Sequence, residues 1–312
     1  MTGIVVYSDV IVPYSVLRAG ATGKLSRQND RTVNQGGYAT ANVIRDVTMR
    51  QYTLGVKPML LEDWERVQGA YEVTDAGAYG MLLEDPTDSK VGTTEGALMG
   101  YMAGVESGTV GFGNGTPLYG LRKLYTAFTS TRKRARIITR PKGTPALLRG
   151  GSPVTVGAAA GNVGFSAAPV YATFVADATR TVSAITVGAT TQVTLSSAIA
   201  GLVIGGRLWL QGLTGADAAL LNNLSHQITA ISGGGLNVYT LATNTAGKTI
   251  TAGSGQGHKY PQPDETLTWS GDFYVPVQFA NDDMDWDFLL HGEYDRRLIA
   301  GPSVPLIEIR EA

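Results

Sequence analysis

The sequence contains no cysteine among its 312 residues. This excludes disulfide bonds, thiolate catalysis and zinc sites built on thiolates, and it leaves the redox compartment open. Charged residues make up 16% of the chain, below the usual share of about 25%. The net charge of −1 gives no overall field that would draw the chain to nucleic acid or to an anionic membrane. We therefore expect no sequence-specific nucleic-acid binding.

Long apolar runs are also missing. No stretch approaches the roughly 18 apolar residues that a membrane helix needs, so no membrane insertion is expected. The first residues lack a basic region followed by an apolar run, which disfavours a signal peptide. We expect a protein that is made in the cytoplasm and leaves it only inside a larger particle.

Glycine, in contrast, is abundant, with 40 residues, and this composition favours strands and turns over helices. Runs rich in β-branched residues predict strands at 4–12, 43–55, 78–85, 135–139 and 266–279. Residues 118–128 fit either a helix or a strand, and residues 15–43 fit a long loop or short strands. The expected fold class is mainly β with one or two helices, an α+β protein.

The best helix begins at Pro58, because proline suits a first helical turn. It is marked by one apolar stripe at spacings of four, three and four, formed by Leu60, Trp64, Val67 and Tyr71. We interpret it as a helix packed on a sheet.

The composition changes near residue 176. Between 176 and 258 there are five charged residues, and short apolar strands alternate with glycine turns. The expected strands are 184–187, 192–195, 207–211, 227–231 and 236–241, with one helical turn within 216–224. Evenly spaced short strands predict a small β-barrel or sandwich. Residues 258–264, with two prolines, predict a stiff linker.

This pattern predicts two domains. Residues 1–175 and 259–312 are expected to form one domain of β-sandwich or barrel-like type, which is interrupted by an inserted all-β domain at 176–258. Insertions of this kind occupy exposed loops whose ends are close.

The C-terminal part predicts two further strands. Met284, Trp286 and Phe288 alternate with aspartates, which predicts a half-buried strand with an acidic outer face formed by Asp283, Asp285 and Asp287. Residues 304–310 predict a last strand, and Pro305 near its start indicates an edge position.

No motif carries a specific chemistry, so we predict no enzyme, no cofactor and no metal site. The segment 242–249 resembles a phosphate-binding loop loosely, but the residues after it cannot form the required helix, and a turn is favoured. The 111–115 glycines also predict a turn. His226, His258 and His291 share no ligand spacing. A cation site other than an EF-hand stays as an alternative for the aspartates near 285.

A basic cluster lies in the middle of the chain, formed by Arg132, Lys133, Arg134, Arg136 and Arg140. Such a cluster can contact phosphates, but it lacks the aromatic residues that interleave in nucleic-acid sites. A subunit contact or a solvated loop is favoured.

Several segments outside 176–258 resemble the distal tail protein family of long-tailed bacteriophages and gene transfer agents. The resemblance rests on their order along the chain: Gly23–Gly37, Gly80-Met-Leu-Leu-Glu-Asp85-Pro-Thr-Asp88, Leu121-x-Lys-x-Tyr125, Arg136-Ile-Ile-Thr-Arg140-Pro141, Gly161–Pro169, Phe273-Tyr-Val-Pro-Val277-Gln-Phe-Ala-Asn-Asp282 and Ser303–Arg310. Leu82 and Leu83 replace aromatic residues of the family pattern, and Gln278 replaces its arginine. Segments within 176–258 look like a small β-module that recurs in phage tail proteins.

The resemblance implies a structural virion protein located at the distal end of a phage tail. It implies a homohexameric ring that docks on the tail tube protein, surrounds the end of the tape-measure protein and adapts the tube to the tail tip or baseplate hub. The module at 176–258 would then project from the outer side. Edge strands at 4–12 or 304–310 are candidates for pairing across subunits.

We consider two further hypotheses. The acidic residues Asp283, Asp285 and Asp287 and the basic residues Arg132, Arg134, Arg136 and Arg140 are candidates for opposite sides of a subunit contact. Alternatively, the 176–258 module binds glycans of the host surface. Sugar sites usually present exposed aromatic residues, and the module has two large ones, Trp209 and Tyr239.

Overall fold

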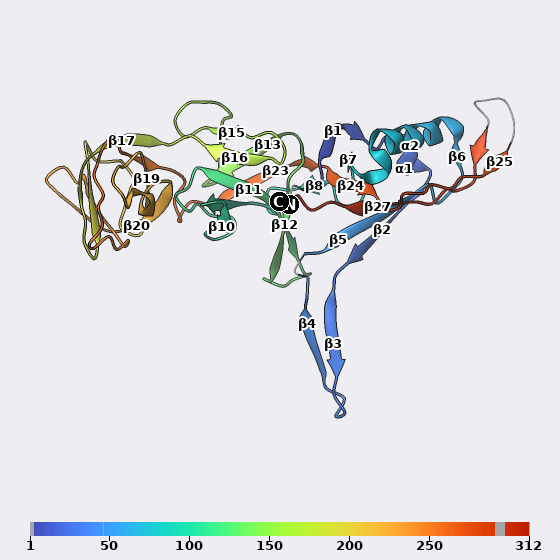
Figure 1. Ribbon diagram of the computed structural model, residues 1–312, viewed down its shortest axis with the longest axis horizontal. Coiled ribbons are helices and arrows are strands. Elements are labelled where there is room, and N and C mark those ends of the chain that lie inside the picture. The colour runs from blue at the N-terminus through green and yellow to red at the C-terminus, as the bar shows by residue number, and fades with distance from the viewer. Residues whose placement is uncertain (1–2, 46, 291–296, 312) are drawn as a thin grey trace. The chain divides into compact units, whose positions relative to one another are not determined.

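The structure, a computed structural model, describes residues 3–45, 47–290 and 297–311 (Figure 1). The chain divides into two compact units, Met1–Ser89 with Phe273–Ala312 and Lys90–Asp272. The described residues are mainly β, with two α-helices and a closed barrel, which confirms the expected fold class. The segment 176–258, expected as an insertion, lies inside the second unit.

The first unit is built on a six-stranded sheet. Its strand order is β1 (Val6–Ile11), β7 (Gly80–Leu83), β24 (Val275–Phe279), β27 (Val304–Glu308), β5 (Met49–Leu54) and β2 (Ala21–Ser26). β1 pairs parallel with β7, and the other pairs are antiparallel. The sheet interior is apolar, since Leu83, Val277 and Leu306 are fully buried. The expected strand at 4–12 is therefore present, at one edge of this sheet.

The expected edge position of the last strand is wrong. β27 lies in the interior of the sheet, between β24 and β5. The β24–β27 ladder ends at the pair Phe279–Leu306, and Leu306 directly follows Pro305 in the sequence, so the proline lies just beyond this ladder. The proline carbonyl still accepts a hydrogen bond from the Ala280 amide at 3.0 Å. The proline has no N–H to donate in return, but it lies at the start of the strand, where one missing donor leaves the rest of the pairing with β24 intact.

Two helices pack in the first unit, α1 (Tyr14–Arg18) and α2 (Leu61–Val73). Trp64 and Val67 of the expected stripe are buried and Tyr71 is half-buried. Leu60, however, is 46% exposed and belongs to β6 (Met59–Leu60), which pairs with β26 (Leu298–Ile299). The helix therefore begins three residues later than Pro58 indicated, because this pairing holds Met59 and Leu60 extended.

The expected strand through Met284 and Trp286 is also wrong. Residues 283–287 form no strand, and β25 begins at Phe288 (Phe288–Leu290), where it pairs with β26. Trp286 is 55% exposed, and its ring packs edge-on against Phe288 at 5.2 Å. The alternation of aspartates and apolar residues indicated a strand with a buried apolar face. Trp286 instead packs against the ring of Phe288 and does not enter the core.

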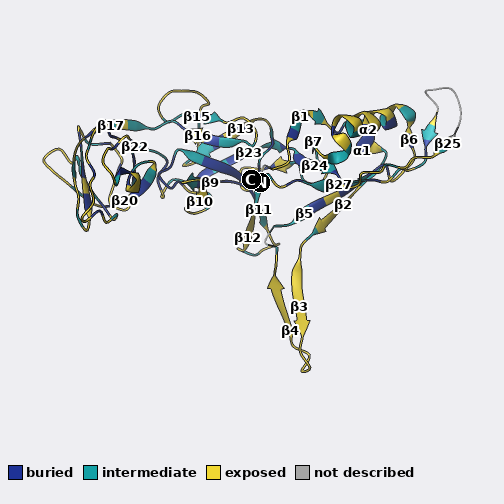
Figure 2. Cartoon of the chain, in the orientation of Figure 1, coloured by how far each residue is buried: buried dark blue, intermediate teal, exposed yellow. Residues whose placement is uncertain are grey.

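Of the segment 15–43, residues 15–18 belong to α1, and the residues after it form short strands joined by turns, the second of the two expected alternatives. β3 (Asn29–Val33) and β4 (Ala39–Val43) make a two-stranded sheet of their own. Every residue of both strands is exposed, and Figure 2 colours them accordingly.

The second unit contains two sheets and the barrel. One sheet has the order β10 (Val105–Ser107), β9 (Gly96–Met102), β11 (Leu118–Thr126), β16 (Tyr171–Phe174) and β15 (Val163–Phe165), and β12 (Lys133–Ile138) pairs with β11. The other has the order β14 (Ser152–Pro153), β13 (Pro141–Arg149), β23 (Leu267–Phe273) and β8 (Lys90–Val91). The ambiguous segment 118–128 is thus a strand.

The barrel is closed by six strands. Their order is β17 (Ala178–Thr186), β18 (Thr191–Leu195), β21 (Val238–Leu241), β20 (Leu224–Ser232), β19 (Arg207–Gln211) and β22 (Gln256–Lys259), which pairs again with β17. One helical turn lies at Ala218–Leu220. Closure leaves no open sheet edge. The barrel core is drawn from its own residues, 182–250, and includes Leu208 and Leu210 at zero exposure.

Because this core is self-contained, a cavity in it has a local effect. We expect Leu210→Ala to lower the free energy of unfolding of the barrel by about 2–5 kcal/mol, through lost burial and the cavity left behind. Hydrogen exchange of the barrel amides in the full chain measures this. Ile204, which is 64% exposed, gives a matched control, since Ile204→Ala should change the value by less than about 0.5 kcal/mol. Equal effects of the two substitutions would contradict a barrel core centred on Leu210.

Candidate functional site

The basic cluster spans the loop before β12, β12 itself and the two residues after it, where Arg140 lies. The β11–β12 register places Arg136 opposite Lys123 and Arg134 opposite Tyr125. Arg132 and Arg134 are exposed and Arg136 is partly exposed. Arg140, in contrast, is only 7% exposed. Arg132, Lys133, Arg134 and Arg136 therefore form the accessible part of the cluster, and we call its three arginines the basic surface.

The aspartates form an acidic surface in the first unit. Asp283, Asp285 and Asp287 are all exposed, on an extended segment between β24 and β25. The segment is held at both ends, because the Tyr71 hydroxyl donates to the Asp282 carbonyl and the Ala300 amide donates to the Asp287 carbonyl at 2.8 Å. The acidic surface and the basic surface thus belong to different units of one chain.

The Asp85–Asp88 motif holds a buried arginine that sequence reasoning did not single out. Arg50, on β5, is 7% exposed and pairs with the Asp88 carboxylate, and its Nε lies 3.8 Å from Asp85 Oδ2. The Tyr52 hydroxyl donates to Asp85 Oδ2 at 2.7 Å, and the Thr87 amide donates to Asp85 Oδ1 at 2.8 Å. The two aspartates therefore act as an internal clamp on β5, which is a structural role.

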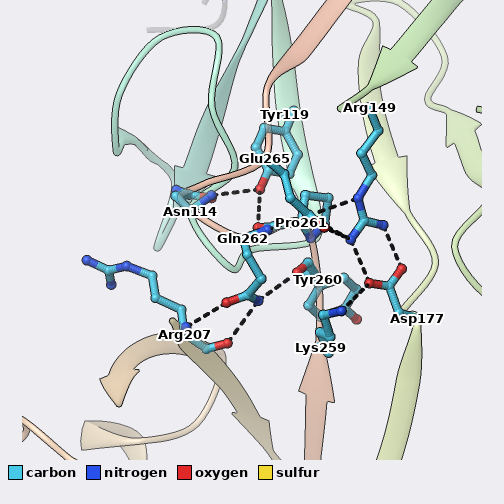
Figure 3. A network of polar contacts seen from close by, with 10 residues as sticks. All are labelled: Asn114, Tyr119, Arg149, Asp177, Arg207, Lys259, Tyr260, Pro261, Gln262 and Glu265. Carbon is cyan, nitrogen blue, oxygen red and sulfur yellow. Dashed lines mark hydrogen bonds and ion pairs between the residues drawn. The ribbon is translucent and has the colours of Figure 1, made fainter. Parts of the chain in front are cut away.

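A larger polar network lies at the base of the barrel, where the chain enters and leaves it (Figure 3). Arg149, at the end of β13, donates to both oxygens of Asp177 at 2.6 Å and to Glu265 at 2.8–3.0 Å. Lys259 Nζ lies 3.7 Å from Asp177. Asp177 precedes the first barrel strand, and Lys259 ends the last one. One guanidinium thus joins the incoming and the outgoing chain.

Electrostatics reinforce this arrangement. Burial by itself lowers the pKa of the Arg149 guanidinium, but the hydrogen bonds and charges of Asp177 and Glu265 outweigh burial and raise that pKa above its usual value. Arg149 therefore stays a cation at every accessible pH, and the two carboxylates retain their partner.

The expected linker at 258–264 is wrong, because its first residues end β22 and Pro261 and Gln262 are packed into the same network. Gln262 is 4% exposed; its Oε1 accepts a hydrogen bond from the Arg207 amide at 2.7 Å, and its Nε2 donates to the Arg207 carbonyl at 3.1 Å. The Tyr119 hydroxyl donates to the Pro261 carbonyl at 3.4 Å and accepts from the Asn114 amide at 3.0 Å. Burial raises the pKa of Tyr119 to about 12. Pro261 and Gln262 thus form part of a packed contact at the base of the barrel, which we call the socket, while Pro263 is exposed.

Two glycines of the 111–115 turn are required by its close contact with this socket. An added Cβ at Gly113 would lie 2.4 Å from the Pro261 and Gln262 carbonyl oxygens, and one at Gly115 would lie 2.5 Å from the Arg207 side chain. Gly115 also has a φ of +72°, a backbone conformation that residues with a side chain rarely adopt. Ser225 Oγ, on β20, donates to the Asn114 carbonyl at 2.8 Å. The turn is therefore pressed directly against the base of the barrel.

The aromatic residues of the barrel are not presented for sugar stacking. Trp209 is 7% exposed and Tyr239 is 1% exposed. The Tyr239 hydroxyl accepts a hydrogen bond from the Ile199 amide at 2.9 Å. The feature that would favour the glycan alternative, an exposed aromatic side chain, is thus not found on the barrel strands.

The remaining motifs have structural surroundings. The 242–249 segment holds a turn with no helix after it, and Lys248 Nζ lies 3.4 Å from Asp217. His226 and His258 are buried in the barrel, while His291 lies outside the described residues. Among the residues that the structure describes, no three histidine, aspartate or glutamate side chains gather as metal ligands would. Nor does any described helix have the length and apolarity to span a bilayer.

Comparison with known proteins adds no family to these observations: no protein-family model and no curated protein matches the sequence.

Removing Arg149 should loosen the base of the barrel. We expect Arg149→Met to lower the free energy of unfolding by about 2–4 kcal/mol, because it removes the cation shared by two half-buried carboxylates and leaves Asp177 with Lys259 alone. Urea unfolding at pH 7 measures the loss. Adding Asp177→Asn and Glu265→Gln in the same chain should recover part of it, since the uncompensated charges disappear. A loss that the added substitutions leave unchanged would contradict an electrostatic origin.

Acid should destabilise the barrel through its histidines. Burial lowers the pKa of His226 and of His258 below the ordinary 6.5, so the unfolded chain binds protons more readily than the folded one. Their contribution to stability is complete above pH 6.5 and is lost as the pH falls below it, by at most about 1.4 kcal/mol per pH unit for each histidine. Urea unfolding between pH 5 and 8 should show this slope. His258→Gln should reduce it, and an unchanged slope would count against His258.

Proposed function

We propose that this chain is a structural virion protein that forms a ring at the distal end of the tail of a long-tailed bacteriophage. In this role it joins the tail tube protein to the tail tip or baseplate hub and surrounds the end of the tape-measure protein. Its task is association and not chemistry. The ordered sequence motifs support the proposal.

The observation that carries the proposal is the pair of charged surfaces. The acidic surface holds three exposed aspartates, and the basic surface holds three arginines, of which Arg132 and Arg134 are exposed and Arg136 is partly exposed. A head-to-tail contact needs two different, complementary surfaces on each copy, and such a contact closes into a ring when the rotation suits. In this proposal the acidic surface of one copy meets the basic surface of the next. Opposite charges at such a contact guide encounter and fix register.

The clamped barrel is compatible with a place on the outside of such a ring. Arg149 and Gln262 hold the base of the barrel by side-chain contacts to both of its chain ends. In the assembled tail, the barrel is then an appendage held at a fixed angle to its own unit, and it reaches outward from the ring.

Reversing the acidic surface tests the contact. We expect Asp285→Lys with Asp287→Lys to weaken ring formation at least tenfold, because like charges then face each other across the contact. Native mass spectrometry across a concentration series measures the assembly. Adding Arg134→Glu and Arg136→Glu in the same chain should restore it.

Two controls frame this experiment. Asp264→Lys changes one exposed aspartate outside both surfaces and should leave assembly unaffected. Raising the salt concentration should weaken the wild-type ring, because exposed charges are screened. Rings that persist after the reversal of Asp285 and Asp287 would rule out this contact.

A further inference from the structure

The β3–β4 ribbon has one apolar face that its own chain leaves uncovered. Directly opposed residues share a face of an antiparallel pair, and the register is Arg31 with Ala41 and Val33 with Ala39. One face therefore carries four apolar side chains, Val33, Ala39, Ala41 and Val43, together with the polar Asn29 and Arg31. The other face carries only polar ones, Asp30, Thr32, Thr40 and Asn42.

Exposure makes this pattern informative. Val33 is 66% exposed and Val43 is 56% exposed, although both lie on the apolar face. A strand pair with alternating apolar and polar residues normally buries its apolar face, and a two-stranded sheet by itself is marginally stable. The ribbon is thus built to lie against a surface.

A groove of matching character lies in the first unit, between β1 and α2. It has a volume of about 330 Å³. Met81 and Phe279 belong to its floor, while Ile11 and Val73 stand at its rim, 43% and 57% exposed. Its charged lining residues are Asp9 and Arg66, and Arg66 is paired with Glu62 and Asp63. The groove therefore suits aliphatic side chains and not a polar small molecule.

Gly69 supports the use of this groove for docking. It lies inside α2, where glycine is unfavourable, and an added Cβ would meet nothing within 4 Å. Packing within the chain therefore does not require glycine at this position. A segment lying close against the helix backbone would require it.

Charge identifies the occupant. α2 carries four acidic residues and one arginine, and Asp9 adds a further carboxylate beside it. The base of the ribbon, residues 24–31, carries Lys24, Arg27 and Arg31 against a single aspartate, all of them exposed. Both the ribbon and the rim of the groove are exposed, so the chain does not fill its own groove.

We propose that the apolar face of the β3–β4 ribbon of one copy docks in the groove between β1 and α2 of a second copy. Val33 and Val43 enter the groove, and the basic base of the ribbon lies along the acidic helix. The inference rests on the proposed self-assembly and adds a contact separate from that of Asp285 and Asp287. Each copy has one ribbon and one groove, so the contact repeats head to tail.

Engineered cysteines test the docking directly, because the natural chain has none. One full-length variant carries Val43→Cys, and a second, with a tag of different mass, carries Val73→Cys on the rim of the groove. The two are mixed under mild oxidation, and intact mass spectrometry counts the mixed disulfide dimer. We expect this dimer to form at least tenfold faster than with Asn42→Cys in place of Val43→Cys. Equal rates would overturn the proposal, since Asn42 is on the polar face of the same ribbon.

A second measurement separates this contact from the ring itself. Val43→Asp should weaken assembly at least tenfold in native mass spectrometry, while Thr40→Asp, on the polar face, should not. Both sites are exposed, so circular dichroism should show the fold unchanged. If rings still form with Val43→Asp and the two disulfide rates are equal, the ribbon does not dock in this groove, but the proposed ring is retained. If the mixed disulfide forms fast but no closed rings are seen, the docking contact is supported and the proposed ring is contradicted.

Discussion

The ion pairs of Arg149 are the interaction on which the second unit depends. The barrel has its own core, so burial alone stabilises its interior but does not fix it to the rest of the unit. That task falls to polar contacts at its base, and Arg149 reaches both the chain that enters the barrel and the chain that leaves it. Because the guanidinium is planar and offers several donors, it can hold two carboxylates at once, which a lysine could not do in the same geometry.

The sequence allowed much of the fold to be predicted, and the reasons for each failure are physical. The barrel strands were visible because apolar strands and glycine turns alternate at short range. The interior position of β27 could not be predicted. Pro305 indicates an edge strand unless it is known where the ladder with the neighbouring strand ends. The start of α2 was misplaced because a pairing with β26, more than 200 residues away, keeps Met59 and Leu60 extended.

For the candidate site, too, some positions could be predicted from the sequence and others could not. The aspartates near 285 were correctly expected to lie at the surface, since charged residues stay hydrated without a partner. Arg140 looked like its basic neighbours but is buried, and Arg50 looked unremarkable but is clamped by Asp85 and Asp88. Local spacing could not reveal the clamp on Arg50, because its partners Asp85 and Asp88 are more than 30 residues away in the sequence. The packed Pro261–Gln262 segment was missed for the same reason, since prolines in a polar stretch resemble a linker until the surface against them is known.

The pairing of β17 with β22 brings the two ends of the barrel side by side, with Ala178 opposite Lys259. A domain whose ends are adjacent can be exchanged for another one without altering the path of the chain that carries it. The carrier has only to keep its socket, made by the 111–115 turn and Arg149, or to build a new one with the incoming domain. This geometry lets the barrel be replaced as one piece, while the sheets that carry it keep their own chain path.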